Sequence, residues 1–166
     1  MSEVVFDLIG VLARPSWREL VADPSVHDWR KLRVGAINEE AFWEPRLAAA
    51  YRRAFGLRRD RVELLMRLRA AGHGIVIASN FARAWARMVQ AHMPAGLVGR
   101  WVISGEVGAA KPEPAFFTAL AAARGTVMVD DQAGNLAAAE AAGLRGVLAA
   151  PGCDLATQVA RALARG

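Results

Sequence analysis

The sequence predicts an α/β fold in which a doubly wound parallel sheet carries a small helical insertion. Short apolar runs typical of buried strands alternate with stretches of helical spacing, a pattern that favours parallel strands joined by helices. One long segment breaks that alternation. With 166 residues and 54% hydrophobic composition, the chain can bury one sizeable core and is too short for two ordinary domains.

Five short runs rich in β-branched residues predict the strands of this sheet. Each is bounded by Gly, Ser, Asp or a similar turn former. The runs occupy residues 4–6, 74–78, 101–103, 126–129 and 146–148.

Stretches with helical spacing lie between these runs. They are centred on residues 62–68 and 85–89 and continue as alanine-rich runs at 114–123, 133–142 and 154–165. Gly72 and Gly143 stand directly after two of the stretches, where a left-handed residue commonly ends a helix. We therefore expect helices to cover both faces of the sheet.

Residues 14–60 are predicted to form a short helical cap insertion, with 1–13 and 61–166 forming the core. The segment carries three candidate helix starts: Ser16 with Glu19, Ser25 with Asp28, and Asn38. It also holds three of the five tryptophans: Trp17, Trp29 and Trp43. Two interpretations of these rings stay open. They close the seam between insertion and core, or with Leu20 and Phe42 they line a pocket for an apolar leaving group.

The net charge of +5 invites a nucleic-acid interpretation, because clustered cations bind phosphate backbones. The arginines, however, are spread in ones and twos without a basic block, so nucleic-acid binding is not expected. No window approaches the roughly 18 apolar residues of a membrane span. Glu3 and Asp7 also do not suit a signal peptide, and we expect a cytoplasmic protein. The single cysteine, Cys153, excludes an intramolecular disulfide.

Polar residues end three of the predicted strands. Asp7 follows the first, Ser79 and Asn80 follow the second, and Asp130 and Asp131 follow the fourth. In open parallel sheets the ligand crevice lies at the carboxyl ends of the strands, so these side chains are expected to converge. Each of them alone could be an ordinary turn former.

Lysine usage singles out one further position. Of 21 basic residues only Lys31 and Lys111 are lysines. The lysine at position 111, directly before Pro112 in a chain that otherwise uses mostly arginine, indicates that a compact ammonium is wanted there.

Four stretches resemble, in order, the four motifs of the haloacid dehalogenase-like (HAD) hydrolase superfamily, whose core is Rossmann-like. They are Val4-Val5-Phe6-Asp7-Leu8-Ile9-Gly10-Val11-Leu12, Ile77-Ala78-Ser79-Asn80, Lys111-Pro112-Glu113-Pro114 and Val129-Asp130-Asp131-Gln132-Ala133-Gly134-Asn135. The second and fourth motifs, with residues 35–42 of the insertion, are most similar to the branch of sugar-1-phosphate phosphatases and epoxide hydrolase N-terminal phosphatase domains. The resemblance covers nearly the whole chain.

The resemblance implies a role for each motif residue. Asp7 would be the nucleophile and a Mg²⁺ ligand, joined by the backbone carbonyl of Ile9 and by Asp131 with Asp130 beside it. Mg²⁺ suits such a sparse oxygen set because it keeps several waters. Ser79 and backbone N–H groups near Asn80 would bind the phosphoryl group. Lys111 would neutralise both the aspartate and the transferred group.

One position departs from the pattern. Phosphatase branches usually carry a second aspartate two residues after the nucleophile, and here that residue is Ile9. Isoleucine cannot protonate a leaving group or activate water, and such general acid–base catalysis contributes about 10²–10⁴-fold. The resemblance therefore implies a slow Mg²⁺-dependent phosphatase acting on a small phosphorylated substrate.

Two alternatives stay open. A catalytically degenerate protein could use the fold to bind a phosphorylated ligand or a protein partner. A haloacid dehalogenase-type hydrolase would also lack an acid at position 9, because a halide leaves without a proton, but such enzymes dispense with magnesium and would not need Asp130 and Asp131. The substrate and the oligomeric state do not follow from the sequence.

Overall fold

A five-stranded parallel sheet forms the centre of the computed structural model, which describes residues 2–14, 29–37 and 56–165. The strand order is β5-β4-β1-β6-β7, and every neighbouring pair is parallel. The strands are β1 (Glu3–Phe6), β4 (Gly74–Ser79), β5 (Arg100–Ile103), β6 (Val127–Asp130) and β7 (Arg145–Leu148). The predicted α/β parallel sheet is therefore confirmed, with each strand end within one residue of its expected place.

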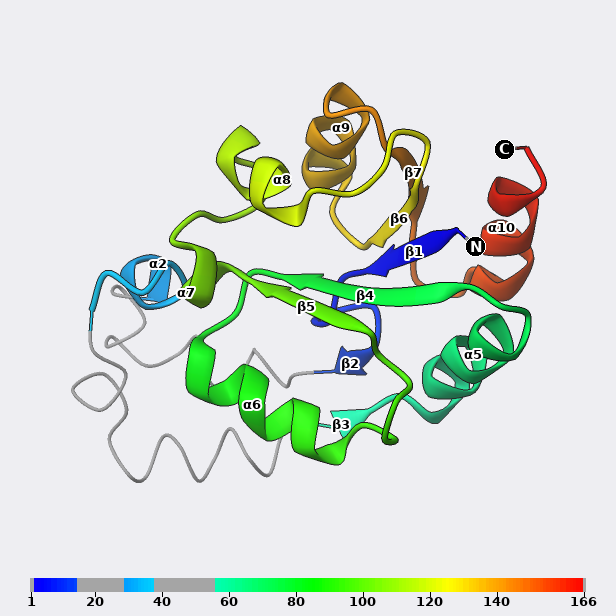
Figure 1. Ribbon diagram of the computed structural model, residues 1–166, viewed down its shortest axis with the longest axis horizontal. Coiled ribbons are helices and arrows are strands. Elements are labelled where there is room, and N and C mark those ends of the chain that lie inside the picture. The colour runs from blue at the N-terminus through cyan, green and yellow to red at the C-terminus, as the bar shows by residue number, and fades with distance from the viewer. Residues whose placement is uncertain (1, 15–28, 38–55, 166) are drawn as a thin grey trace.

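Helices pack on both faces of this sheet (Figure 1). They are α2 (Trp29–Leu32), α5 (Arg59–Ala70), α6 (Arg83–His92), α7 (Ser104–Val107), α8 (Pro114–Leu120), α9 (Ala133–Ala141) and α10 (Leu155–Leu163). Gly72 and Gly143 both have φ of 89° directly after α5 and α9, as expected for helix-ending glycines.

Helix α8 ends earlier than its alanine-rich run predicts. Ala121 adopts a left-handed φ of 47° directly after Leu120. Arg100 Nη1 donates to the carbonyl oxygen of Leu120 at 2.6 Å. A cation bonded to a terminal carbonyl stabilises a helix end, and Arg100 is distant in sequence, so the local pattern does not reveal this end.

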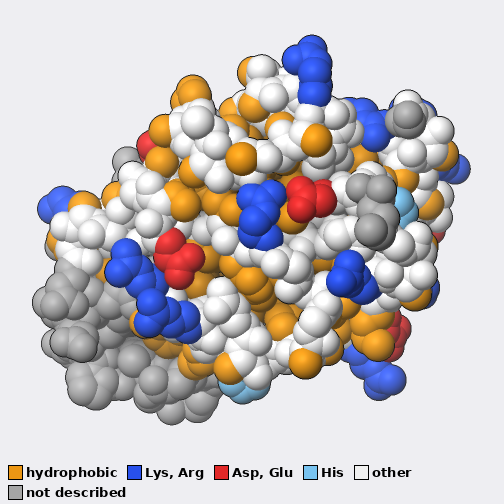
Figure 2. All heavy atoms as spheres, viewed as in Figure 1, with side chains coloured by type: hydrophobic (Ala, Val, Ile, Leu, Met, Phe, Trp, Pro, Cys, Tyr) orange, Lys and Arg blue, Asp and Glu red, His pale blue; other side chains and the backbone are white. Residues whose placement is uncertain are grey.

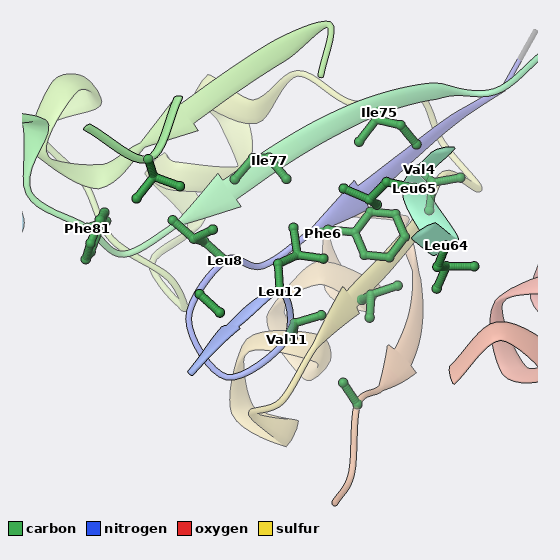
Figure 3. Close-up of a cluster of buried hydrophobic side chains, with 14 of the residues drawn as sticks. Val4, Phe6, Leu8, Val11, Leu12, Leu64, Leu65, Ile75, Ile77 and Phe81 are labelled. Atoms are coloured by element: carbon green, nitrogen blue, oxygen red, sulfur yellow. The ribbon is translucent and has the colours of Figure 1, made fainter. Parts of the chain in front are cut away.

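Alternate residues of β1 enter different halves of the core because successive side chains of a strand point to opposite faces. Val4 and Phe6 belong to the cluster that contains residues of α5, α6 and α10, and Val5 belongs to the cluster that contains residues of α8 and α9. Figure 3 shows the first cluster, with Phe6 among side chains from β4 and α5. All three β1 residues are fully buried. The sheet is thus covered on both faces, which leaves the strand ends as places for polar side chains.

A small two-stranded antiparallel sheet marks where the chain leaves and rejoins the core. Strand β2 (Ala13–Arg14) pairs with β3 (Gly56–Leu57), with Arg14 opposite Gly56. The three candidate caps at Ser16, Ser25 and Asn38 lie outside the described residues, as do Trp17 and Trp43, and for Trp29 only the backbone in α2 is described. The extent of the insertion stays a prediction.

Candidate active site

The polar strand ends come together at one edge of the sheet. Asp7 follows β1, Ser79 ends β4 and Asp130 ends β6, three strands that are neighbours in the sheet. A cavity of about 500 Å³ opens here, with Asp7, Ser79, Asn80, Lys111 and Asp131 in its lining. The expected convergence is therefore present.

Lys111 is the centre of a buried charge cluster. Its Nζ donates to Asp7 Oδ1 at 2.9 Å and to Asp130 Oδ2 at 2.6 Å. The exposed fractions of Lys111 and Asp7 are only 2% and 4%, and Asp130 is fully buried. Burial alone would lower the pKa of Lys111, but attraction to the two carboxylates outweighs it and raises the pKa above its usual value. The lysine therefore stays charged, as its predicted role requires.

Asp7 carries the most consequential titration of the site. Burial raises its pKa to about 6, an effect that Lys111 partly offsets and the Asp130 charge reinforces. Loss of water around the buried carboxylate is thus the main reason that Asp7 resists ionisation, and the nearby Asp130 charge adds to it. Further positive charge at this edge would favour the ionised, nucleophilic form.

The two adjacent aspartates of the fourth motif have different surroundings. Asp130 accepts hydrogen bonds from Lys111, from the Gln132 N–H at 2.9 Å and from Asn135 Nδ2 at 3.0 Å. These donors hold Asp130 as an internal anchor. Asp131 instead faces the cavity. Sequence reasoning did not single out Asn135, although it lies at a helical position one turn from the strand end and is buried.

Gly10 permits the Asp131 carboxylate to approach the loop after β1. A Cβ atom at Gly10 would lie 2.1 Å from Asp131 Oδ2, and its φ of +91° also disfavours a side chain.

Carboxylate oxygens of Asp7, Asp130 and Asp131 lie within 4.8 Å of one another. Burial, then the Asp130 charge, raises the pKa of Asp131. A hard divalent cation fits this set of crowded oxygen ligands.

Ser79 and Asn80 do different things although they are adjacent. Ser79 Oγ is buried and has no hydrogen-bond partner within the described part of the chain, and the residue lines the cavity. Buried hydroxyls are normally paired, so this donor indicates a place for an oxygen-bearing ligand. Asn80 uses its side-chain amide on Lys111, donating to the Lys111 carbonyl and accepting from its N–H, both at 2.7 Å. Asn80 therefore positions Lys111 through its side-chain amide.

Three further residues form what we call the outer wall of the cavity: Ile9, Arg14 and Arg33. Ile9 fills the position of the missing second aspartate. Arg14 lies on β2 and Arg33 directly follows α2, so both arginines approach the site from outside the central sheet. No motif or spacing in the sequence identified the two arginines, because only tertiary contacts bring them to the strand ends.

Solved structures share this architecture. A HAD family enzyme from Bacteroides thetaiotaomicron is 18% identical, with 96% of this chain and 98% of that chain covered at a TM-score of 0.80. Its wild-type complex with magnesium and inorganic phosphate matches at 18% identity and TM-score 0.76, covering 93% and 96%. A HAD-like family hydrolase from Porphyromonas gingivalis is 19% identical at TM-score 0.78, with 98% of each chain covered. These likenesses establish the fold.

The sequence itself matches a family model. Among curated proteins, none is significantly similar to this chain. The model for haloacid dehalogenase-like hydrolases, in contrast, matches residues 25–143, which is well over half of the chain. The chain therefore belongs to the haloacid dehalogenase-like hydrolase family.

Proposed function

We propose that this protein is a slow Mg²⁺-dependent phosphatase that hydrolyses small phosphorylated substrates through an aspartyl-phosphate at Asp7. The observation that carries the proposal is the arrangement at the cavity floor, which we define as Asp7, Ser79, Lys111, Asp130 and Asp131. A buried carboxylate, a buried ammonium and an unpartnered hydroxyl meet there. These are a nucleophile, a countercharge and an oxygen-binding donor for a phosphoryl group.

The metal would be held by Asp7, by Asp131 and by the backbone carbonyl of Ile9. Bound there, Mg²⁺ supplies positive charge that offsets the repulsion between the carboxylate and an anionic phosphoryl group. Asp130 supports this arrangement from below by orienting Lys111. The complex of the Bacteroides thetaiotaomicron enzyme with magnesium and inorganic phosphate supports such a pairing of ion and ligand.

In the first step an Asp7 oxygen attacks phosphorus, and the bond to the leaving oxygen breaks. Ser79 donates to a phosphoryl oxygen, and Lys111 holds the attacking carboxylate in its ionised form. In the second step water attacks phosphorus, Asp7 is released and a proton passes to solvent. Neither step has an acid–base group at position 9, whose absence costs about 10²–10⁴-fold in rate.

The test is Mg²⁺-dependent release of phosphate from an aryl phosphate by the wild type, Asp7→Asn and Ile9→Asp. Asp7→Asn should abolish turnover, and Ile9→Asp should raise it by about 10²-fold or more. Asp154→Asn is the matched control, because Asp154 caps α10 away from the cavity and asparagine caps a helix equally well. Undiminished activity in Asp7→Asn would overturn the proposal.

Ile9 itself favours a second candidate, in which the fold binds a phosphorylated ligand or partner without turnover. Under this candidate the wild type releases no phosphate, yet it binds Mg²⁺ and phosphate in calorimetry. Turnover gained in Ile9→Asp would then mark a protein that has lost its acid–base residue.

A further inference from the structure

The outer wall presents two guanidinium groups to the same cavity that holds Asp7. Arg14 and Arg33 both line it. Among the described residues, neither is paired with a carboxylate, whereas Lys111 is paired with two. The wall is thus a positively charged surface facing the catalytic floor.

The core holds Arg33 in place. Ser104 Oγ donates a hydrogen bond to the Arg33 carbonyl, and Ser104 is fully buried. Two residues later, a Cβ at Gly35 would come within 2.9 Å of the Gly105 carbonyl, so the segment packs closely on α7. The Nε of Arg33 is buried and has no hydrogen-bond partner among the residues that the structure describes. A buried donor without an acceptor is costly, which indicates an acceptor that a ligand would bring.

The backbone of Arg14 is fixed too, although its side chain is exposed. Strand β2 pairs Arg14 with Gly56 of β3. Close by, the Arg58 N–H donates to the Leu12 carbonyl at 2.8 Å. Both guanidinium groups therefore start from anchored backbone positions.

A leaving group must lie near these arginines. In phosphoryl transfer the attacking and leaving oxygens are roughly in line on opposite sides of phosphorus. Asp7 attacks from the sheet side, so the leaving group points away from the strand ends. Arg14 and Arg33 line the cavity from elements outside the central sheet.

The described part of the cavity lining offers this leaving group no proton. Among the described lining residues the ionisable groups are Asp7, Asp131, Lys111 and the two arginines. Asp7 is the nucleophile, Asp131 is assigned to the metal, and Lys111 donates to Asp7 and Asp130. Arginine remains protonated in proteins. A leaving group that needs protonation, such as an alkoxide, is therefore poorly served.

We propose that the preferred substrate is a phosphoryl anhydride, either an acyl phosphate or a diphosphate, whose departing oxyanion is received by Arg33 and Arg14. This rests on the proposed function and specifies its substrate class. Asp7 forms the bond to phosphorus, the bridging P–O bond breaks, and its electron pair leaves with a carboxylate or a phosphate. No proton is transferred in that step. The planar fork of arginine binds either oxyanion through two parallel hydrogen bonds.

The first experiment compares single-turnover phosphoryl transfer to the enzyme from acetyl phosphate, pyrophosphate and glycerol phosphate. The wild type should react at least about 10²-fold faster with one or both anhydrides than with the alkyl ester, since general acid assistance is worth that much. Comparing the rates with acetyl phosphate and pyrophosphate shows whether a carboxylate or a phosphate is the preferred leaving group. Ile9→Asp should accelerate glycerol phosphate selectively.

The second experiment removes the guanidinium groups. Arg33→Met and Arg14→Met should each lower the rate with the preferred anhydride about tenfold more than they lower the rate with glycerol phosphate. Arg33→Lys keeps the charge and should recover part of the loss, because the bidentate geometry is still absent.

The third experiment reads binding rather than rate. In the Asp7→Asn background, calorimetry with Mg²⁺ should show that Arg33→Met weakens pyrophosphate binding about tenfold more than it weakens inorganic phosphate binding. Arg87→Met is the control, since Arg87 is an exposed residue of α6 that does not line the cavity.

The outcomes separate this inference from the proposed function. Asp7-dependent turnover with equal rates for all three substrates, or equal losses in the arginine variants, would overturn the anhydride preference alone. Phosphate release that persists in Asp7→Asn would overturn both.

Discussion

The floor and the outer wall of the cavity differ in how their polar and charged groups are paired. On the floor, buried charges are bonded to one another, as Lys111 is to Asp7 and Asp130. On the wall, Arg14 is exposed, Arg33 has an unpartnered Nε, and Ile9 is apolar. The bonded charges of the floor fix its geometry, whereas the Ser79 hydroxyl of the floor and the Arg33 Nε of the wall have no partner among the described residues and are open to a ligand. The contrast indicates that the charges of the floor help to stabilise the fold and that the side chains of the wall determine which substrate is preferred.

The largest expected effect on stability and activity follows from removing the ammonium group of Lys111 from the floor. Lys111→Met leaves Asp7 and Asp130 as buried carboxylates without a countercharge, and breaking a buried pair costs about 3–5 kcal/mol. Urea unfolding should report that loss of stability, and phosphatase activity should vanish. Arg87→Met is the control, since Arg87 is exposed and outside the cavity lining. A Lys111→Met protein as stable as the wild type would contradict the view that the floor supports the fold.

A smaller loss of stability and activity is expected when the side chain of Asn80, which holds the Lys111 backbone, is removed. Asn80→Ala deletes two hydrogen bonds to the Lys111 backbone and leaves a partly buried donor and acceptor unpaired. Such a change costs about 2–4 kcal/mol. Activity should fall mainly in kcat, because the ammonium loses its position against Asp7. An effect on stability alone would mean that Lys111 is positioned by other contacts.

Gly10→Ala tests the junction between floor and wall. Its Cβ would overlap Asp131 Oδ2, so the variant should bind Mg²⁺ at least tenfold more weakly in calorimetry. The left-handed backbone alone costs alanine about 1–2 kcal/mol. Gly72→Ala is a matched control, because Gly72 has nearly the same φ and nothing within 4 Å of the added atom. Equal Mg²⁺ affinity in both variants would argue against Asp131 as a ligand.

The polar strand ends were predictable because they depend on local sequence: a buried apolar run followed by Asp, Ser or Asn marks the edge where parallel strands finish. The two arginines of the outer wall were not. Arg33 reaches the cavity only because its carbonyl bonds to Ser104, 71 positions away. Likewise Asn80 looks like a phosphate-binding residue in the sequence, and its commitment to the Lys111 backbone depends on a partner 31 positions away. The motifs gave no signal for either contact.

Titration of Asp7 should appear in the stability of the metal-free protein. Its pKa of about 6 in the native state exceeds the usual 3.8, so the native state binds more protons than the unfolded chain between these values. The unfolding free energy should therefore fall as pH rises from about 4 to about 6 and should level off above, for this group. The difference between wild type and Asp7→Asn isolates it. A difference independent of pH across this window would contradict the raised pKa.

The smallest effect on stability is expected at the wall. Arg14→Met should change the free energy of unfolding by less than about 0.5 kcal/mol, because the side chain is exposed and has no carboxylate partner among the described residues. Thermal unfolding of this variant beside Lys111→Met measures the contrast directly. A large destabilisation in Arg14→Met would show that the wall, too, is structural.

The reciprocal amide pair between Asn80 and Lys111 fixes orientation as well as separation, because two bonds between the same two groups remove rotation about either one. The amide pair fixes the Lys111 backbone, and the bonds to Asp7 and Asp130 fix its ammonium, so the entropy of aligning the ammonium with Asp7 is lost during folding and not again when a substrate binds. The charged groups of the site are thus already aligned when a substrate binds. The slow steps of the reaction are then those that move protons or water.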